Sequence, residues 1–224
     1  MRILWLLNIC PPAVGKALGL ECSVREGWIT GALNRFLAED GDGKGAEEME
    51  LGICFPVDPL SGTEISEKRR LYPLTAGQSR PAEGQEPAGK RQTEAVLQPA
   101  GQAPEAGREV WLYGFREDLK RPERYDPMLE KRFAQILADF RPDLVHIFGT
   151  EFPHALAMER AFRHPERTLV GIQGLVGECA KSYMADLPPA VQKSVTLRDL
   201  LRKDSLRQQQ EKFRLRGERE REIL

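Results

Sequence analysis

Polar side chains and glycines follow three apolar segments of the sequence, at the points where buried strands are expected to end. Asn8 follows the first segment, Glu151 and His154 follow a later one, and Gln173 and Gly174 follow a third. A carboxylate and an imidazole can exchange protons with a hydroxyl group, and an amide can hydrogen-bond to one. We therefore take Glu151 and His154 as candidate catalytic residues, and the other three as candidate substrate-binding residues.

The elements that must position these residues are strands and helices in alternation. Apolar runs typical of buried strands occupy residues 2–9, 49–57, 109–115, 144–149 and 167–175, with a weaker one at 69–75. Helical spacing of apolar residues marks the stretches 29–37, 126–140, 152–164, 176–183 and 196–224. This alternation predicts an α/β fold, with a doubly wound, mostly parallel Rossmann-like sheet and a long C-terminal helix. Ligands of such a sheet bind beyond the carboxyl ends of its strands, where the candidate residues are expected.

Two segments depart from the alternation and set the expected domain boundaries. Residues 77–107 are rich in Gly, Pro, Gln and Ala, so they cannot bury enough apolar surface to fold, and we expect a disordered insertion. Residues 196–224 read as one long charged helix. Residues 1–195 then form one Rossmann-like domain.

Composition excludes several classes of protein. A net charge of −1 argues against a nucleic-acid surface spread over the whole molecule. The four cysteines form no CxxC pair and have no histidine at metal-ligand spacing, so we expect reduced thiols in a cytoplasmic protein and no metal site. The first residues resemble a signal peptide, but their apolar run is short and a buried first strand is the better interpretation.

The loop at residues 8–28 lacks the GxGxxG pattern of dinucleotide-binding proteins, so no cofactor is expected. Gly27 stands just before a helix, where a backbone amide could approach a phosphate, although a plain surface loop is the alternative. The sequence Asp40-Gly41-Asp42 imitates a metal-binding DxD, but its position between a helix and a strand favours an ordinary turn.

Simpler structural roles compete with the catalytic ones in the loop after residue 148. Thr150 or Glu151 could merely cap the following helix. His146, inside the apolar strand, is better explained as a core histidine than as a catalytic one.

Several blocks of the chain, taken in order, resemble the N-terminal half of glycosyltransferase family 4 enzymes. They are "RILWLLNI", "EGWITGAL", "YDPMLEKRFAQILADFRPDLVHIFGTEFPHALAM", "GIQGLVGECAKSY" and "TLRDLLRKDSLRQQQEKFRLRGERERE", which together cover most of the chain outside residues 77–107. The resemblance implies a GT-B fold, in which two Rossmann-like domains face each other across a cleft. It also implies transfer of a sugar from a nucleotide-sugar to a hydroxylated acceptor, with retention of configuration and without a metal.

On this resemblance the chain is the acceptor-side domain. The donor-binding half is expected to follow the helix at 196–224 or to lie on a second polypeptide, and this domain alone should bind weakly and turn over little. Relatives carry a Gly-Gly pair before an aromatic residue in the first loop, where this chain has Glu26, Gly27 and Trp28. We therefore add Gly27 and Trp28 to the candidate substrate-binding residues.

Two further positions depart from the family pattern. Many relatives end the fourth strand with His-x-His, where this chain has His146 and Phe148, so the imidazole expected to contact the sugar or acceptor is that of His154. Gln173 stands where relatives often have histidine, and it could hydrogen-bond a hydroxyl but not exchange a proton at neutral pH.

Two alternatives remain open. The chain could be a non-catalytic interaction module whose terminal helix presents its apolar residues to a partner helix or a membrane surface; these are Leu197, Leu200, Leu201, Phe213 and Leu215. The mixed charges along this helix argue against a membrane anchor. The other alternative is a different Rossmann-like enzyme, which would need a cofactor fingerprint that the sequence lacks.

Overall fold

A computed structural model describes residues 1–20, 27–38, 49–60, 62–74 and 107–224. Except for Gly107, the insertion expected at 77–107 lies outside the described residues, as do Cys22, Glu26 and the Asp40-Gly41-Asp42 turn.

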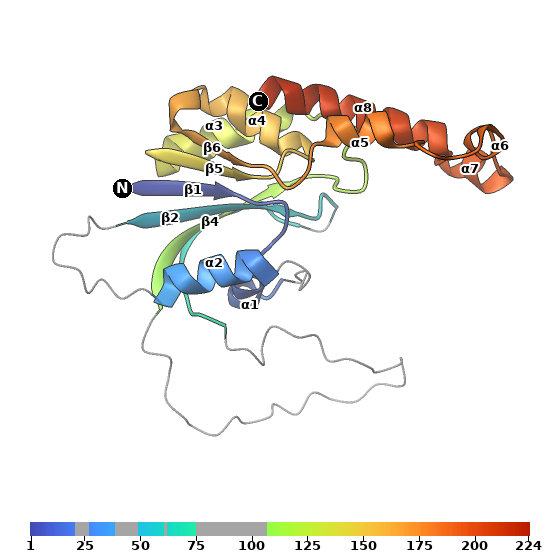
Figure 1. Ribbon diagram of the computed structural model, residues 1–224. Coiled ribbons are helices and arrows are strands. Elements are labelled where there is room, and N and C mark those ends of the chain that lie inside the picture. The colour runs from blue at the N-terminus through green and yellow to red at the C-terminus, as the bar shows by residue number, and fades with distance from the viewer. Residues whose placement is uncertain (21–26, 39–48, 61, 75–106) are drawn as a thin grey trace, which may run out of the picture. The chain divides into compact units, whose positions relative to one another are not determined.

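The described residues form a six-stranded sheet in the order β3-β4-β2-β1-β5-β6 (Figure 1). The strands are β1 Arg2–Leu6, β2 Glu50–Val57, β3 Ile65–Leu71, β4 Arg108–Arg116, β5 Leu144–Phe148 and β6 Thr168–Gly171. Pairing is parallel between β4 and β2, β2 and β1, β1 and β5, and β5 and β6. The chain therefore adds strands on one side of β1 and then returns to add them on the other. The expected α/β fold with a mostly parallel, doubly wound Rossmann-like sheet is confirmed.

Helices occupy most of the connections. They are α1 Pro12–Leu18, α2 Gly27–Ala38, α3 Met128–Phe140, α4 Pro153–Phe162, the 3-10 helix η1 Pro165–Arg167, α5 Val176–Ser182, α6 Pro189–Gln192, α7 Leu197–Arg202 and α8 Leu206–Ile223. The chain divides into two compact units. One comprises Met1–Asn8, Met49–Glu67 and Trp111–Leu224, and the other comprises the described residues of Ile9–Glu48 and Lys68–Val110.

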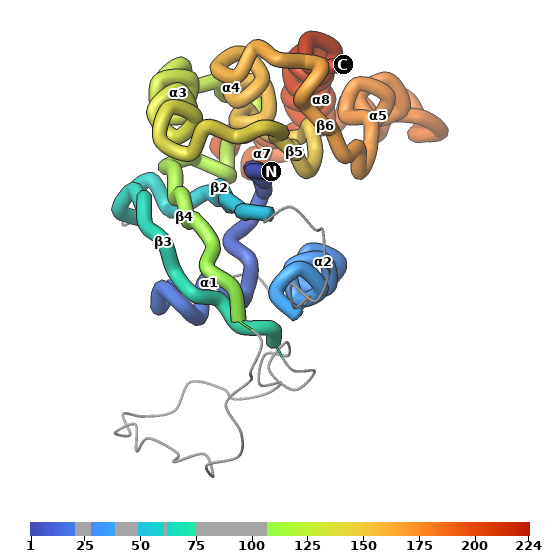
Figure 2. Tube along the Cα trace, turned by 90° about the vertical axis from the view of Figure 1, so that its left-hand side faces the viewer, coloured from blue at the N-terminus to red at the C-terminus, as the bar shows by residue number. Residues whose placement is uncertain are grey.

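The larger unit has its core between strands and helices. Figures 1 and 2 show α3, α4, α8 and α5 in one layer beside β5 and β6. The apolar stripe predicted for α3 faces the core, since Leu129, Phe133, Ile136 and Phe140 are all buried. The helix ends at Arg141, which adopts a left-handed conformation before a proline, as the sequence indicates.

The smaller unit contains α1 and α2. The predicted stripe of α2 is confirmed, because Ile29, Leu33, Phe36 and Leu37 are buried. Asn34 on the same helix exchanges two hydrogen bonds of 2.9 Å with the backbone of Leu74, which fixes the segment after β3.

Three boundaries differ from the sequence expectation. The weak strand expected at 69–75 lies at Ile65–Leu71. The loop expected at 8–28 contains α1, because Pro12 begins a helix as well as ending an extended run. The long C-terminal helix is confirmed as α8, but it begins at Leu206, since the chain breaks at Lys203 with φ of 53° and restarts with Ser205 as N-cap.

Candidate functional site

The carboxyl ends of three neighbouring strands bring the candidate loops together in the larger unit. In the register of β1 and β5, Leu6 pairs with Ile147, so Asn8 and the loop that begins at Gly149 leave the same edge. The Gly149 N–H donates to the carbonyl of Gly171 at 2.8 Å, which ties this loop to the end of β6. This edge includes the point where the strand order reverses, between β1 and β5, which is where ligands bind in doubly wound sheets.

His154 lies at the centre of the site, in the first turn of α4, with no exposed side-chain surface. Its Nδ1 lies 2.5 Å from Oε2 of Glu117, and its backbone N–H donates to Oε1 of the same carboxylate at 3.2 Å. Phe152 stacks on the imidazole and Phe115 meets it edge-on, with ring centroids 5.5 and 5.3 Å away. The ring is therefore held from three sides, and its orientation is fixed.

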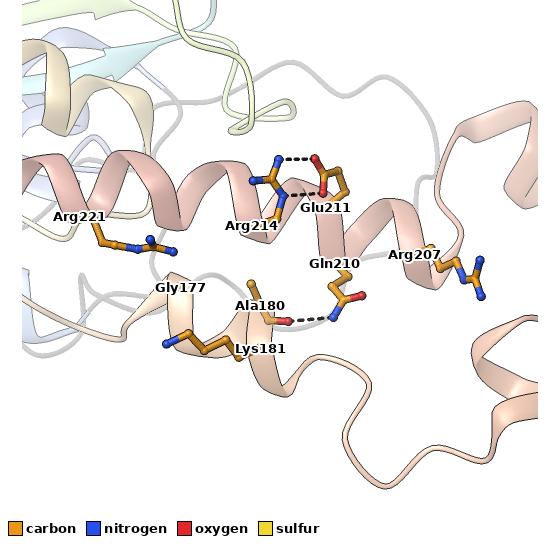
Figure 3. A pocket seen from close by; sticks show the side chains of 8 residues that line it. All are labelled: Gly177, Ala180, Lys181, Arg207, Gln210, Glu211, Arg214 and Arg221. Carbon is orange, nitrogen blue, oxygen red and sulfur yellow. Dashed lines mark hydrogen bonds and ion pairs between the residues drawn. The ribbon is translucent and has the colours of Figure 1, made fainter.

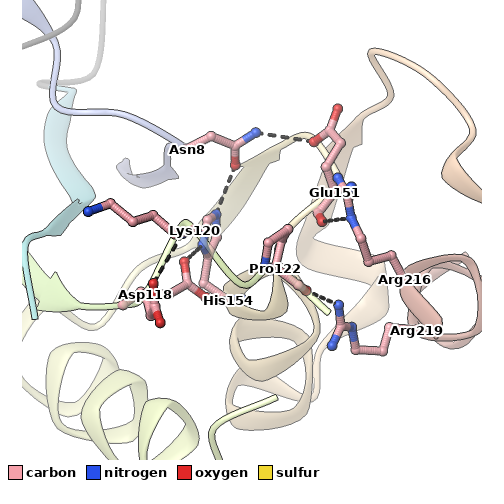
Figure 4. A network of polar contacts seen from close by, with 9 residues as sticks. Asn8, Asp118, Lys120, Pro122, Glu151, His154, Arg216 and Arg219 are labelled. Atoms are coloured by element: carbon pink, nitrogen blue, oxygen red, sulfur yellow. Dashed lines mark hydrogen bonds and ion pairs between the residues drawn. The ribbon is translucent and has the colours of Figure 1, made fainter. Parts of the chain in front are cut away.

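Asn8 connects the histidine to Glu151 (Figure 4). Its Nδ2 donates to Oε2 of Glu151 at 3.1 Å, and its Oδ1 lies 2.8 Å from Nε2 of His154. Because a carboxylate only accepts, the amide must turn its nitrogen to Glu151 and its oxygen to the histidine. Both imidazole nitrogens then face acceptors. The result is a hydrogen-bonded series that joins Glu117, His154, Asn8 and Glu151.

Gly149 makes this series sterically possible. Its φ of +96° lies in the left-handed range that side chains disfavour, and a Cβ built there would collide with the carboxylate of Glu151 and the amide of Asn8. A glycine is therefore required between β5 and the polar loop.

Two arginines of α8 hold the backbone around the site. Arg216 Nε donates to the carbonyl of Glu151 at 3.0 Å, and Arg219 donates to the carbonyls of Pro122 and Glu123. Burial lowers the pKa of both guanidinium groups from its ordinary value. The long C-terminal helix thus fixes the loops after β5 and β4.

Glu220, also on α8, forms a second buried centre. Its carboxylate accepts from the Thr150 hydroxyl at 2.7 Å and from the N–H groups of Val176 and Gly177 at 3.1 and 2.9 Å. Gly177 and Gly217 allow α5 and α8 to approach so closely, because a Cβ at Gly217 would lie 2.5 Å from Cα of Gly177. One side chain therefore joins α8, the β5–α4 loop and the start of α5.

The helix-capping alternative for Thr150 and Glu151 is wrong. The N-cap of α4 is Phe152, which makes no side-chain cap, and the carboxylate that accepts an N–H from its first turn belongs to Glu117. Thr150 instead donates to Glu220 of α8, and Glu151 accepts from Asn8 after β1 and from Arg216 of α8. Their polar groups therefore join separate elements of the tertiary structure.

The other candidate residues lie as follows. Gln173 and Gly174 are exposed between β6 and α5. Gly27 is the first residue of α2 in the smaller unit, and Trp28, about half exposed, follows it. His146 is partly buried and stacks on Phe148 with ring centroids 3.8 Å apart, and its burial lowers its pKa. The convergence of Trp28 with His154 and Gln173 on one substrate stays a prediction.

Sequence reasoning missed Glu117, Arg216 and Glu220. Glu117 is the first residue after β4, so the rule that selected Asn8 and Glu151 would have found it if applied to that strand as well. No local pattern in the sequence distinguishes Arg216 or Glu220 from the many other charged residues of α8. Only their neighbours in the tertiary structure differ.

The arrangement offers one partly exposed carboxylate backed by a buried, fully paired histidine. Glu151 is the member of the series that remains partly accessible, whereas His154 acts on it only through Asn8. The structure therefore favours a positioning role for His154, and its direct contact with a substrate stays a prediction. Within the described residues there is no cluster of His, Cys, Asp and Glu side chains that could hold a metal ion, and no helix is both long and apolar enough to cross a bilayer.

Comparison of the chain with known protein families, with curated proteins and with solved structures gives no match.

Proposed function

We propose that this chain is the acceptor-side domain of a retaining glycosyltransferase of the GT-B type. The observation that supports this most is the polar series of Asn8, His154, Glu117 and Glu151 at the switch point of a doubly wound sheet. Such a series is not needed for packing, since its three buried members, Asn8, His154 and Glu117, carry a desolvation cost that apolar residues would avoid.

In this function Glu151 receives the hydroxyl group of the acceptor. A carboxylate that accepts a hydrogen bond from the hydroxyl makes its oxygen a better nucleophile toward the sugar carbon of the donor. Asn8 donates to Oε2 of Glu151, and His154, itself held by Glu117, fixes Asn8. The carboxylate of Glu151 is therefore held in one orientation. Gln173 and Gly174 contribute amide and backbone groups to hydroxyls of the acceptor. Gly27 and Trp28 stay candidate substrate-binding residues on the family resemblance alone.

The nucleotide-sugar is held mainly by a donor-binding domain, on the same or a second polypeptide. The coding sequence beside this one is the first place to search for that domain. We expect UDP- and GDP-sugars to leave the melting temperature of the chain unchanged, and to raise it when the chain is joined to its donor domain. A clear rise with the chain alone would contradict the division into two half-sites.

Acceptor binding can be tested on the chain itself. Saturation-transfer NMR against a panel of mono- and disaccharides should detect binding to the wild type. The affinity for these saccharides should be at least about tenfold lower in Glu151→Gln, because the variant loses a charge-assisted hydrogen bond. Glu166→Gln is the matched control, since Glu166 is an exposed carboxylate beside His164 and outside the site. Equal binding by the wild type and both variants would refute the assignment of Glu151.

A further inference from the structure

The short helix α7 presents an apolar surface to solvent. Leu197, Leu200 and Leu201 lie on one face of it at i, i+3 and i+4, and they are 75%, 64% and 79% exposed. Figure 1 shows α7 with α6 at the N-terminal end of α8, the end far from the C-terminus. Three neighbouring leucines so exposed are unusual on a soluble surface and indicate a binding partner. We call these three residues the α7 surface.

Cations surround the α7 surface, while the nearby carboxylates are already bonded. Arg198, Arg202 and Lys203 are exposed on or beside α7. Asp199 accepts from the backbone N–H of Thr196 at 2.9 Å, and Asp204 lies 3.5 Å from the ammonium group of Lys212. The surface available to a partner is therefore apolar with a cationic border.

A basic pocket continues this surface along α8. A cavity of about 350 Å³ between α5 and α8 is lined by Lys181, Arg207, Arg214 and Arg221, with Glu211 as its one carboxylate (Figure 3). Arg207 stands in the first turn of α8, five residues after the end of α7, so one end of the pocket lies at the end of α8 that carries α7. We call it the α5–α8 pocket.

The cations of the α5–α8 pocket are only partly neutralised. Glu211 is paired with Arg214 at 2.7 Å, and Lys181 is paired with Glu178 at 2.5 Å. In the part of the chain that the structure describes, the guanidinium groups of Arg207 and Arg221 have no hydrogen bond or ion pair, and they lie toward opposite ends of the pocket (Figure 3). Guanidinium groups are well suited to phosphate oxygens, which they can bind with two hydrogen bonds.

We infer that α7 and the α5–α8 pocket dock this domain on the surface of an anionic phospholipid bilayer. The leucines enter the region between headgroups and acyl chains, and the border cations face the charged headgroups. Arg207 and Arg221, at opposite ends of the pocket, each bind the phosphate of a different lipid. Charge complementarity selects this occupant over an apolar protein groove, since the cations border the leucines and continue into the pocket. The inference stands independently of the proposed glycosyltransferase activity.

The break between α7 and α8 is what creates this surface. In one continuous helix, the leucines of 197–201 and the acidic residues of α8 would belong to the same element. That mixture of apolar and acidic residues argues against membrane binding. Because α7 ends at Arg202 and Lys203 adopts a left-handed conformation, the leucines and cations of α7 form a separate segment.

Co-sedimentation with vesicles tests the inference on the whole chain. We expect binding to phosphatidylcholine vesicles that contain phosphatidylglycerol, weaker binding at high salt, and little binding to phosphatidylcholine alone. Leu200→Ser with Leu201→Ser should weaken binding by about a hundredfold, and Arg207→Gln and Arg221→Gln by roughly fivefold each. All four side chains are exposed or line an open pocket, so the variants should fold, which circular dichroism can verify.

Matched controls distinguish this binding from nonspecific adsorption to vesicles. Leu60→Ser removes another fully exposed leucine, and Lys131→Gln removes an exposed cation of α3, and neither should change binding. Equal binding to neutral and anionic vesicles, or no binding to either, would overturn the inference. So would a dimer in light scattering that Leu200→Ser and Leu201→Ser dissociate, because a second copy would then cover the surface. A rise in melting temperature with inorganic phosphate but no vesicle binding would also overturn it, in favour of a soluble anion.

Discussion

Replacing Glu220 tests whether one buried carboxylate holds the C-terminal helix to the site. Its side chain is 3% exposed and accepts from Thr150 Oγ1, Val176 N and Gly177 N at 2.7, 3.1 and 2.9 Å. Glu220→Ala leaves these three donors without their acceptor in a buried place.

The magnitude follows from the number and type of bonds. A hydrogen bond to a charged group contributes about 1.5–3 kcal/mol. The Thr150 and Val176 bonds share one oxygen, Oε1, so the three contributions do not add fully. We expect Glu220→Ala to lower the free energy of unfolding by about 3–5 kcal/mol. Glu220→Gln keeps an oxygen for two donors but turns an NH₂ group toward the third, so we expect a loss of about 1–2 kcal/mol.

Urea unfolding followed by circular dichroism gives these free energies from the midpoint and slope. Hydrogen exchange supplies a local readout, because the amides of Val176 and Gly177 should lose protection in Glu220→Ala before the core strands do. Glu218→Ala is the matched control on the same helix: Glu218 is about half exposed and paired with Arg214 on the surface, so its loss should cost less than about 0.5 kcal/mol. If Glu220→Ala cost no more than Glu218→Ala, the reasoning that α8 is anchored through this carboxylate would be refuted.

Three further predictions concern strain, titration and thiol reactivity. Gly149→Ala should lower the free energy of unfolding by roughly 2–4 kcal/mol in urea titrations. Gly31→Ala, with open space around it in α2, should be neutral or stabilising. Equal losses of unfolding free energy in the two variants would contradict the steric role of Gly149. Burial, followed by the hydrogen bond to Glu130, raises the pKa of Tyr125 from 10.0 to about 12, so the unfolded state loses this proton first and stability should fall as pH rises from about 10 to 12. That fall should be smaller in Tyr125→Phe, and identical urea midpoints for both proteins across this range would show that Tyr125 does not contribute. Burial also raises the pKa of the Cys54 thiol, so in a Cys10→Ser, Cys22→Ser background Ellman's reagent should modify exposed Cys179 quickly and Cys54 only after unfolding. A fast phase that survives Cys179→Ser in that background would disprove this order.

Local patterns in the sequence predicted the elements well where burial is regular. The stripe of α3 and the apolar run of β2 identify themselves because a helix buries every third or fourth residue and a strand buried on both faces is apolar throughout. The capping signals for the break in the C-terminal helix were also present, since Ser205 and Gln208 form a capping box, but the long periodic pattern obscured them.

The candidate site was predictable in part. Asn8, Glu151 and His154 were selected as polar residues at strand ends, and the fold joins them in one hydrogen-bonded series. The burial of His154 was not predictable, because it depends on pairing with Glu117. This residue follows a different strand and lies 37 positions away in the chain.

The sequence by itself determined the type and order of the elements, the mostly parallel sheet, and the edge at which polar residues gather, because these follow from local periodicity and from the rule that parallel strands share one carboxyl edge. Tertiary structure alone decided which charges of the C-terminal segment are structural and which face solvent. Glu220 is buried beside α5 and Arg216 is half-buried beside the β5–α4 loop, whereas Arg207 and the leucines of α7 are exposed. The physical reason is that a charged side chain takes its role from the groups that replace its water, and those groups come from segments far away in the chain.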